Sequence, residues 1–182
     1  MGVQVPPLAP NKMENVMNYT NVITSLPVYK TWQIKEEKSI WKNSIFEFFH
    51  KIPSPRSKGS QGEKLVEQFM TELGHSVSKP ESSDHDRIIS NYKTEIKVST
   101  SWDNTENKFT WQQIRDQDYE RIIFVGINPN NIEIFWATKS DLKKNIFGKD
   151  KYRQHGGKKG KQDLYWLQSV HKLAWFRDIG DF

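Results

Sequence analysis

The stretch from Asp84 to Thr100 constrains the fold of this chain more than any other part of its sequence. Ile88 and Ile89 precede the pair Ser90-Asn91, and Ile96 and Val98 follow it. Short apolar runs on both sides of a small polar pair predict two strands joined by a tight turn. We therefore expect a β-hairpin whose loop is Ser90-Asn91.

A two-residue loop at this position fixes which side chains meet across the hairpin. Residues equally distant from the loop face each other, so Asp86 is expected opposite Glu95, and Asp84 opposite Lys97. Side chains alternate faces along a strand, which puts Glu95 and Lys97 on the same face. Facing Cβ atoms lie about 4.5–5.5 Å apart. The hairpin therefore predicts a cluster of Asp86, Glu95 and Lys97.

Two carboxylates and a lysine suit a hard divalent cation. Carboxylate oxygens are ligands that Mg²⁺ prefers, and a cation relieves the repulsion between two close carboxylates. Asp86 and Glu95 are the candidate ligands of Mg²⁺, for which Mn²⁺ can substitute, and Lys97 can orient a water molecule or neutralise charge on a phosphoryl oxygen. The alternative is a Glu/Lys salt bridge on a solvated sheet face.

Asp86 followed by Glu95-Ile96-Lys97 resembles the signature of the PD-(D/E)XK nucleases, in which an Asp on one strand precedes Glu-x-Lys on the next. The resemblance covers about residues 60–140. The whole chain also resembles the small cleavage subunit of heterodimeric type IIS restriction endonucleases. No Pro precedes Asp84 or Asp86, so the choice of metal-binding aspartate stays open between them.

The flanking segments extend this resemblance. Gly62 to Val66, running on to Leu73-Gly74, is similar to the first helix of the family with its acidic residue, which corresponds to Glu63. An ordinary first-turn glutamate favoured by the helix dipole is the other reading of Glu63. Phe109 to Arg115 is similar to a helix that lies beside DNA, so Gln113 and Arg115 become candidate DNA contacts. A solvated helix face is the competing interpretation.

The resemblance implies an α/β fold, a restriction-endonuclease-like mixed β-sheet flanked by helices, with an N-terminal helical extension. We expect residues 1–58 to form that arm and extension, and residues 59–182 to form the nuclease core with a basic C-terminal loop. Apolar spacing and capping signals predict the individual elements. These are helices over 39–52, from Ser60 or Gln61 to Leu73, over 111–121 and over 141–146; a loop over 53–60; strands over 121–128 and 132–138; and a helix or strand-helix piece over 165–176.

The net charge of +5 is concentrated near the C-terminus. Residues 143–161 carry eight Lys or Arg and one Asp, whereas residues 59–142 carry nine basic and fourteen acidic groups. A basic segment beside an acidic centre suits an enzyme that attracts a nucleic-acid backbone and holds one phosphate at a cation. The candidate DNA contacts in this segment are Arg153, Lys158, Lys159 and Lys161, unless it is a mobile solvated loop.

Composition excludes several other classes of protein. The chain has no cysteine, so it has neither a disulfide framework nor a thiolate metal site, and a cytoplasmic location is expected. No apolar run is long enough to cross a membrane. His85 lies between Asp84 and Asp86, but the histidines form no pair with zinc-ligand spacing.

These observations predict a Mg²⁺-dependent endonuclease that hydrolyses a phosphodiester of one strand of double-stranded DNA. A chain of 182 residues with a minimal nuclease core has little sequence left for reading several base pairs. We therefore expect a cleavage subunit whose target is chosen by a partner. The resemblance implies that this is the cleavage subunit of a type II (IIS-like) restriction endonuclease, directed by a larger site-recognition and nicking subunit. Two alternatives remain: a structure-selective or repair nuclease that acts without that partner, and a catalytically inert DNA-binding accessory subunit.

Overall fold

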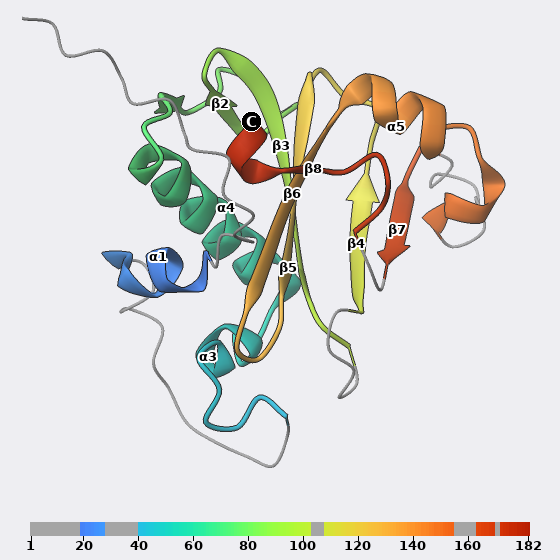
Figure 1. Cartoon of the computed structure of the whole chain (residues 1–182). Coiled ribbons are helices and arrows are strands. Elements are labelled where there is room, and N and C mark those ends of the chain that lie inside the picture. Colours follow the sequence, from blue (N-terminus) through green and yellow to red (C-terminus); the bar gives the residue numbers. More distant parts are fainter. Residues whose placement is uncertain (1–18, 28–39, 103–107, 155–162, 170–171) are drawn as a thin grey trace, which may run out of the picture.

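The computed structural model describes residues 19–27, 40–102, 108–154, 163–169 and 172–182. Its centre is a six-stranded sheet with the strand order β1-β2-β3-β5-β6-β8 (Figure 1). β3 and β5 are parallel neighbours, and the other neighbouring strands are antiparallel. The strands are β1 (Val77–Ser78), β2 (Arg87–Ile89), β3 (Tyr92–Thr100), β5 (Arg121–Ile127), β6 (Ile132–Thr138) and β8 (Arg177–Asp178). This mixed sheet, flanked by helices, confirms the predicted α/β fold class.

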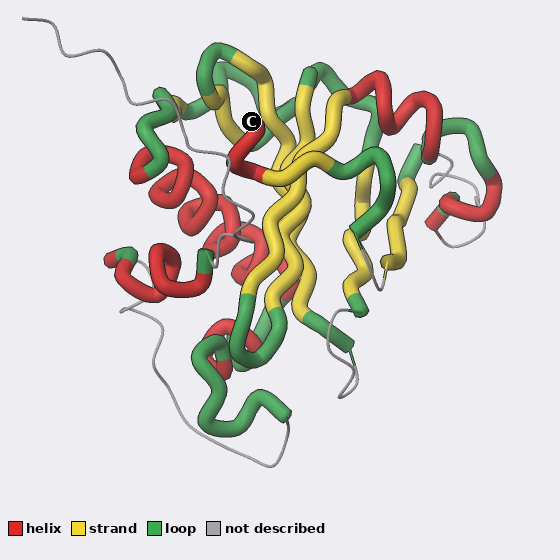
Figure 2. The backbone as a smooth tube through the Cα atoms, viewed as in Figure 1, coloured by secondary structure: helices red, strands yellow, loops and turns green. Residues whose placement is uncertain are grey.

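Each face of the sheet carries its own layer (Figures 1 and 2). On one face lie α1 (Thr20–Ser25), α3 (Glu47–His50) and α4 (Pro55–Glu72). On the other face lie α5 (Lys139–Asn145) and a two-stranded sheet of β4 (Phe109–Ile114) and β7 (Tyr165–Ser169). Two short 3-10 helices, η1 (Asp150–Tyr152) and η3 (Ile179–Asp181), complete the described elements.

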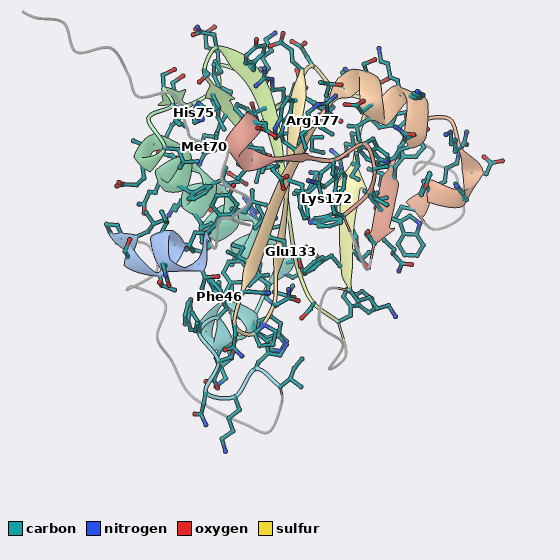
Figure 3. The ribbon with its side chains drawn as sticks, in the orientation of Figure 1. Phe46, Met70, His75, Glu133, Lys172 and Arg177 are labelled. Carbon is teal, nitrogen blue, oxygen red and sulfur yellow. The ribbon has the colours of Figure 1, made fainter. Side chains whose placement is uncertain are left out.

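The two layers enclose two apolar cores, because alternate residues of β5 point to opposite faces of the sheet. Ile123, Val125 and Ile127 pack toward α4 with residues such as Met70, which is fully buried (Figure 3). Ile122 and Phe124 belong to the second core with the apolar side chains of β4, β7 and α5. The central strands are thus buried on both faces.

The longest helix, α4, begins earlier than the sequence predicted. The Ser54 hydroxyl accepts a hydrogen bond from the Ser57 N–H (3.1 Å), and Pro55 occupies the first turn. Proline is favoured there because the N–H it lacks would have no partner in the helix. The predicted loop over 53–60 and the predicted start at Ser60 or Gln61 are therefore wrong, and residues 58 and 59 are consecutive within α4.

The predicted end of this helix is confirmed. Gly74 has a φ of +87°, a left-handed conformation that glycine adopts without steric cost. The N–H of His75 donates to the Met70 carbonyl (3.0 Å), which closes the last turn. This cap directs the chain out of α4 toward β1.

The helix predicted over 39–52 is wrong for most of its length. Ser39, its expected cap, lies outside the described residues, and only Glu47–His50 is helical. Asn43 has a φ of +61°, and its N–H donates to the Glu47 carboxylate (2.8 Å), so the chain turns before the helix begins. The aromatic residues are nevertheless buried, including Trp41, Phe46 and Phe49.

The helix predicted over 111–121 is also wrong, because residues 109–114 form β4. Phe109, Thr110 and Trp111 are buried, and the Trp111 indole N–H donates to the Val125 carbonyl (2.9 Å). Pairing with β7 overrides the weak helical spacing of this segment. Residues 165–176 were predicted to form a helix or a strand followed by a helix. The strand is present as β7, and the described residues 172–176 contain no helix.

The predictions for residues 121–146 are confirmed by β5, β6 and α5. α5 begins with a capping box, in which Thr138 and Asp141 each bond to the other's backbone N–H. Within the described ranges, no helix combines the length and the apolar character that a membrane span needs.

Candidate active site

The β2–β3 hairpin has the predicted register. Arg87 pairs with Thr94, Ile88 with Lys93 and Ile89 with Tyr92. The loop residues Ser90 and Asn91 have φ values of +48° and +68°, as a tight two-residue hairpin turn requires. The strand pairing ends at Arg87, so residues 95–100 of β3 extend beyond β2.

Asp86 lies where β2 stops and β3 continues. Its N–H donates to the Thr94 carbonyl (3.1 Å), and its carboxylate oxygen Oδ2 accepts from the Ile96 N–H (2.8 Å). The Asp84 carboxylate instead accepts from the side-chain amide of Gln117 at 3.5 Å. This geometry favours Asp86 over Asp84 as the aspartate of the cluster.

Glu95 and Lys97 meet on the same face of β3. The Lys97 Nζ lies 2.6 Å from the Glu95 Oε1, and only 7% of Glu95 is exposed. Burial raises the pKa of Glu95 to about 7; Lys97 opposes that rise, and the Asp86 carboxylate adds to it. A cation bound between Asp86 and Glu95 would relieve the cost of two neighbouring carboxylates in a dry site.

Glu63 approaches the same cluster from α4. Burial raises the pKa of Glu63, the Asp86 carboxylate raises it further, and Arg87 opposes both effects. The Arg87 guanidinium bridges α4 and β2, with contacts to Glu63 (3.3 Å) and Glu67 (2.8 Å). It also donates to the Asp86 carbonyl (2.5 Å). Arg87 thereby ties Glu63 and Glu67 of α4 to the end of β2, and Glu63 lies close enough to Asp86 for the two carboxylates to repel each other.

A groove of about 770 Å³ opens onto this cluster. Glu63, Asp86 and Lys97 all line it, whereas the buried Glu95 does not. The floor comes from Ile96 to Thr100 of β3, beyond the end of β2. One wall comes from residues 52–59 at the start of α4, and the other from Thr110, Gln112 and Gln113 of β4. The dimensions and polarity of the groove suit an extended polar ligand.

The structure distributes the predicted DNA contacts unevenly. Gln113 lines the groove, although from a strand and not from the expected helix. Arg115 is exposed and does not line the groove. Arg153 lies 3.1 Å from Asp150, also outside the groove lining. Lys158, Lys159 and Lys161 lie outside the described residues.

Gln112 and Gln113 form a bulge in β4 that the sequence did not reveal. The register with β7 shifts between Trp111 and Ile114, and Gln113 has a φ of +56°. Gln154 is buried and braces the bulge with its side chain. Its Oε1 accepts from the Gln113 backbone N–H (3.1 Å), and its Nε2 donates to the Gln112 Oε1 (3.3 Å). Bulges often re-aim side chains next to active sites.

Sequence reasoning missed four further residues. Arg87 directly follows Asp86 in the chain, and that adjacency was the available signal. Lys58 and Arg56 line the groove but were assigned to a loop, and Trp102, 43% exposed, stands at its edge. Recognising Ser54-Pro55 as a helix start would have placed Arg56 and Lys58 within the two helical turns before Glu63.

The donor set fits a hard cation that is completed by water or substrate oxygens. Within the described part of the chain, no group of three or more His, Cys, Asp or Glu side chains is placed to hold a metal ion, so the protein itself offers at most two carboxylate ligands. Asp86 and Glu95 supply carboxylate oxygens, and octahedral Mg²⁺ commonly keeps several waters beside one or two carboxylates. These two residues would therefore hold such an ion together with ligands from outside the protein.

Comparisons with known proteins find similarity among solved structures. Neither a family model nor a curated protein sequence matches the chain. Among solved structures, the chain is similar to the bacterial homing endonuclease I-Ssp6803I, with a TM-score of 0.41 and 13% sequence identity. The similarity covers 69% of this chain and 81% of that protein.

Proposed function

We propose that this protein is a Mg²⁺-dependent DNA endonuclease that hydrolyses a phosphodiester bond of one strand. The observation that carries the proposal is the convergence of Glu63, Asp86 and Lys97 on one groove, with Glu95 2.6 Å from Lys97. Carboxylates beside a lysine at the open end of a hairpin match the chemistry that phosphodiester hydrolysis needs.

Each side chain has a distinct role in this proposal. Asp86 and Glu95 hold Mg²⁺, for which Mn²⁺ can substitute, and the ion supplies Lewis-acid stabilisation of charge on the phosphate. Lys97 reaches the groove and orients the attacking water, or stabilises a phosphoryl oxygen. Glu63 orients a ligand or a water from the α4 side, and its own orientation is set by Arg87.

The proposal extends to a cleavage subunit of a type II (IIS-like) restriction endonuclease. A single site of this kind cuts one strand, so a double-strand break requires a second active site. We propose that a larger site-recognition and nicking subunit supplies that second site and selects the target.

Supercoiled plasmid cleavage tests the proposed activity. The chain is incubated with plasmid and Mg²⁺, Mn²⁺ or EDTA, with and without proteins encoded beside it, and breaks are mapped on each strand. We expect metal-dependent nicking that Glu95→Gln and Lys97→Ala abolish. Lys93→Ala, on the same strand but paired with Asp118 (2.6 Å), should cut like the wild type.

The result also separates the alternatives. Cutting of branched or mismatched DNA by the isolated chain would favour a structure-selective or repair nuclease. DNA binding with no cutting in any metal, with or without neighbouring proteins, would favour an inert accessory subunit. Activity in a Glu95→Gln/Lys97→Ala double variant would refute the assignment of the site.

A further inference from the structure

Lys58 lies in the wall of the groove, on the same helix as Glu63. It occupies the first turns of α4 and lines the groove that Glu63, Asp86 and Lys97 also line. Gln113 belongs to the opposite wall. The Lys58 side chain can therefore contact a ligand that is bound in the groove.

Lys58 has no carboxylate partner within the part of the chain that the structure describes. Five other lysines form ion pairs with carboxylates, including Lys51 with Glu47 (2.6 Å), whereas no ion pair among the described residues includes Lys58. Its side chain is partly buried, and this burial lowers its pKa. Its charge also contributes to the lowered pKa of His50. A partly desolvated cation without a counter-ion is costly, and an anion in the groove would offset that cost.

A nucleic-acid strand would supply a row of anions along the groove. Each strand of duplex DNA carries one phosphate per about 3.4 Å of helix axis, so a strand held at the carboxylate cluster brings further phosphates along the same groove. The carboxylates at the other end repel a free anion, whereas a strand also gains contacts from Lys97 and the β4 wall. The groove therefore favours a polyanion over a small anion.

We propose that Lys58 binds a backbone phosphate of the cleaved strand, next to the phosphate at Asp86, Glu95 and Lys97, and so positions the strand for cutting. This inference rests on the proposed function, because it assumes that DNA enters the groove. Lys58 is a positioning residue: it contacts the substrate backbone and takes no part in bond breaking. Phosphate contacts of this kind set register and orientation and carry no sequence information.

The salt dependence of DNA binding tests this inference. Affinity of the full chain for a fluorescent duplex is measured by anisotropy at several salt concentrations, in EDTA so that no strand is cut. Loss of one phosphate contact lowers the slope of log K against log [salt] by about 0.9 for a duplex. We expect this reduction for Lys58→Ala, and a wild-type slope for Lys58→Arg, which keeps the charge. Lys64→Ala removes an exposed lysine of the same helix that does not line the groove and should also keep the wild-type slope.

Two outcomes would overturn the inference. One is a wild-type slope for Lys58→Ala with an unchanged melting temperature, and the other is a wild-type protein whose DNA binding does not depend on salt. Failure of the nuclease proposal gives a different result. A protein that binds DNA but never cuts it would refute catalysis, while the slopes would still decide whether Lys58 contacts a phosphate.

Discussion

Gly62 of α4 and Val98 of β3 lie in such close contact that no larger residue fits at position 62. A β-carbon added to Gly62 would lie 2.2 Å from the Val98 Cγ2. Gly62 precedes Glu63 and Val98 follows Lys97, so this contact fixes how far the helix carboxylate stands from the strand lysine. The spacing of the candidate site is therefore set by a packing contact at the floor of the groove.

Gly62→Ala should destabilise the protein and impair cutting. Overpacking of a tight contact costs about 1–3 kcal/mol, because the helix must move away from the strand. Urea denaturation measures the loss, and the combined variant Gly62→Ala/Val98→Ala should recover part of it.

Gly59→Ala is the matched control: a β-carbon there meets nothing within 4 Å. Its higher helix propensity should stabilise α4 by up to about 1 kcal/mol. A Gly62→Ala variant as stable as Gly59→Ala would contradict the close packing.

Glu95 should make stability fall as pH rises. Its pKa is raised from 4.5 to about 7 in the folded protein, so between these pH values the folded state retains a proton that the unfolded state has lost. Stability from this group is therefore highest below pH 4.5, declines as pH rises toward 7 and stays low above it. Glu95→Gln removes this dependence. In EDTA, the stability of the variant relative to wild type should increase by about 2–3 kcal/mol between pH 4.5 and pH 8.

Mg²⁺ provides the control for that experiment. If Asp86 and Glu95 bind the ion, Mg²⁺ at pH 8 should raise the melting temperature of the wild type, because a ligand that binds only the folded state stabilises it. The same concentration should leave Glu95→Gln nearly unchanged. If stability depends on pH equally in the two proteins in EDTA, the pKa of Glu95 is not raised by burial and by the neighbouring Asp86 carboxylate.

Arg87→Met should be more damaging than the loss of a surface ion pair. Arg87 is 12% exposed and contacts both Glu63 and Glu67, so its removal leaves two carboxylates of α4 without their cation. We expect a loss of about 2–3 kcal/mol at neutral pH. Lys172→Met breaks a pair whose side chains are 42% and 57% exposed, and should cost less than about 1 kcal/mol. Chemical denaturation compares the two, and equal losses would refute a structural role for Arg87.

The hairpin could be predicted because its determinants are local. The turn pair Ser90-Asn91 and the alternating side chains fix the register without help from the rest of the chain, so the neighbourhood of Asp86, Glu95 and Lys97 follows from sequence. Gly74 as a helix end is local in the same way.

The errors arose where distant residues decide the structure. β4 is a strand because Trp111 packs under the sheet and the segment pairs with β7, about 55 residues later in the chain. Helical spacing over 39–52 gave way to a turn at Asn43, stabilised by Glu47. The Arg87 bridge and the Gln154 brace join elements that no local pattern connects. The start of α4 at Pro55 is a different error, because its signal was local and was given too little weight.

Gln113→Gly should make the protein more stable and its DNA binding weaker. Gln113 has a φ of +56°, a conformation that costs a residue with a side chain about 1 kcal/mol and costs glycine nothing. The substitution should therefore stabilise β4 by roughly that amount, while it removes an amide from the groove wall. Gln154→Ala should instead destabilise the protein, because the Gln113 N–H loses its acceptor, at a cost of about 1–2 kcal/mol. Urea denaturation and duplex anisotropy on both variants check these effects. If Gln113→Gly binds DNA as tightly as the wild type, the strained bulge does not serve the groove, and Gln113 is not a DNA contact.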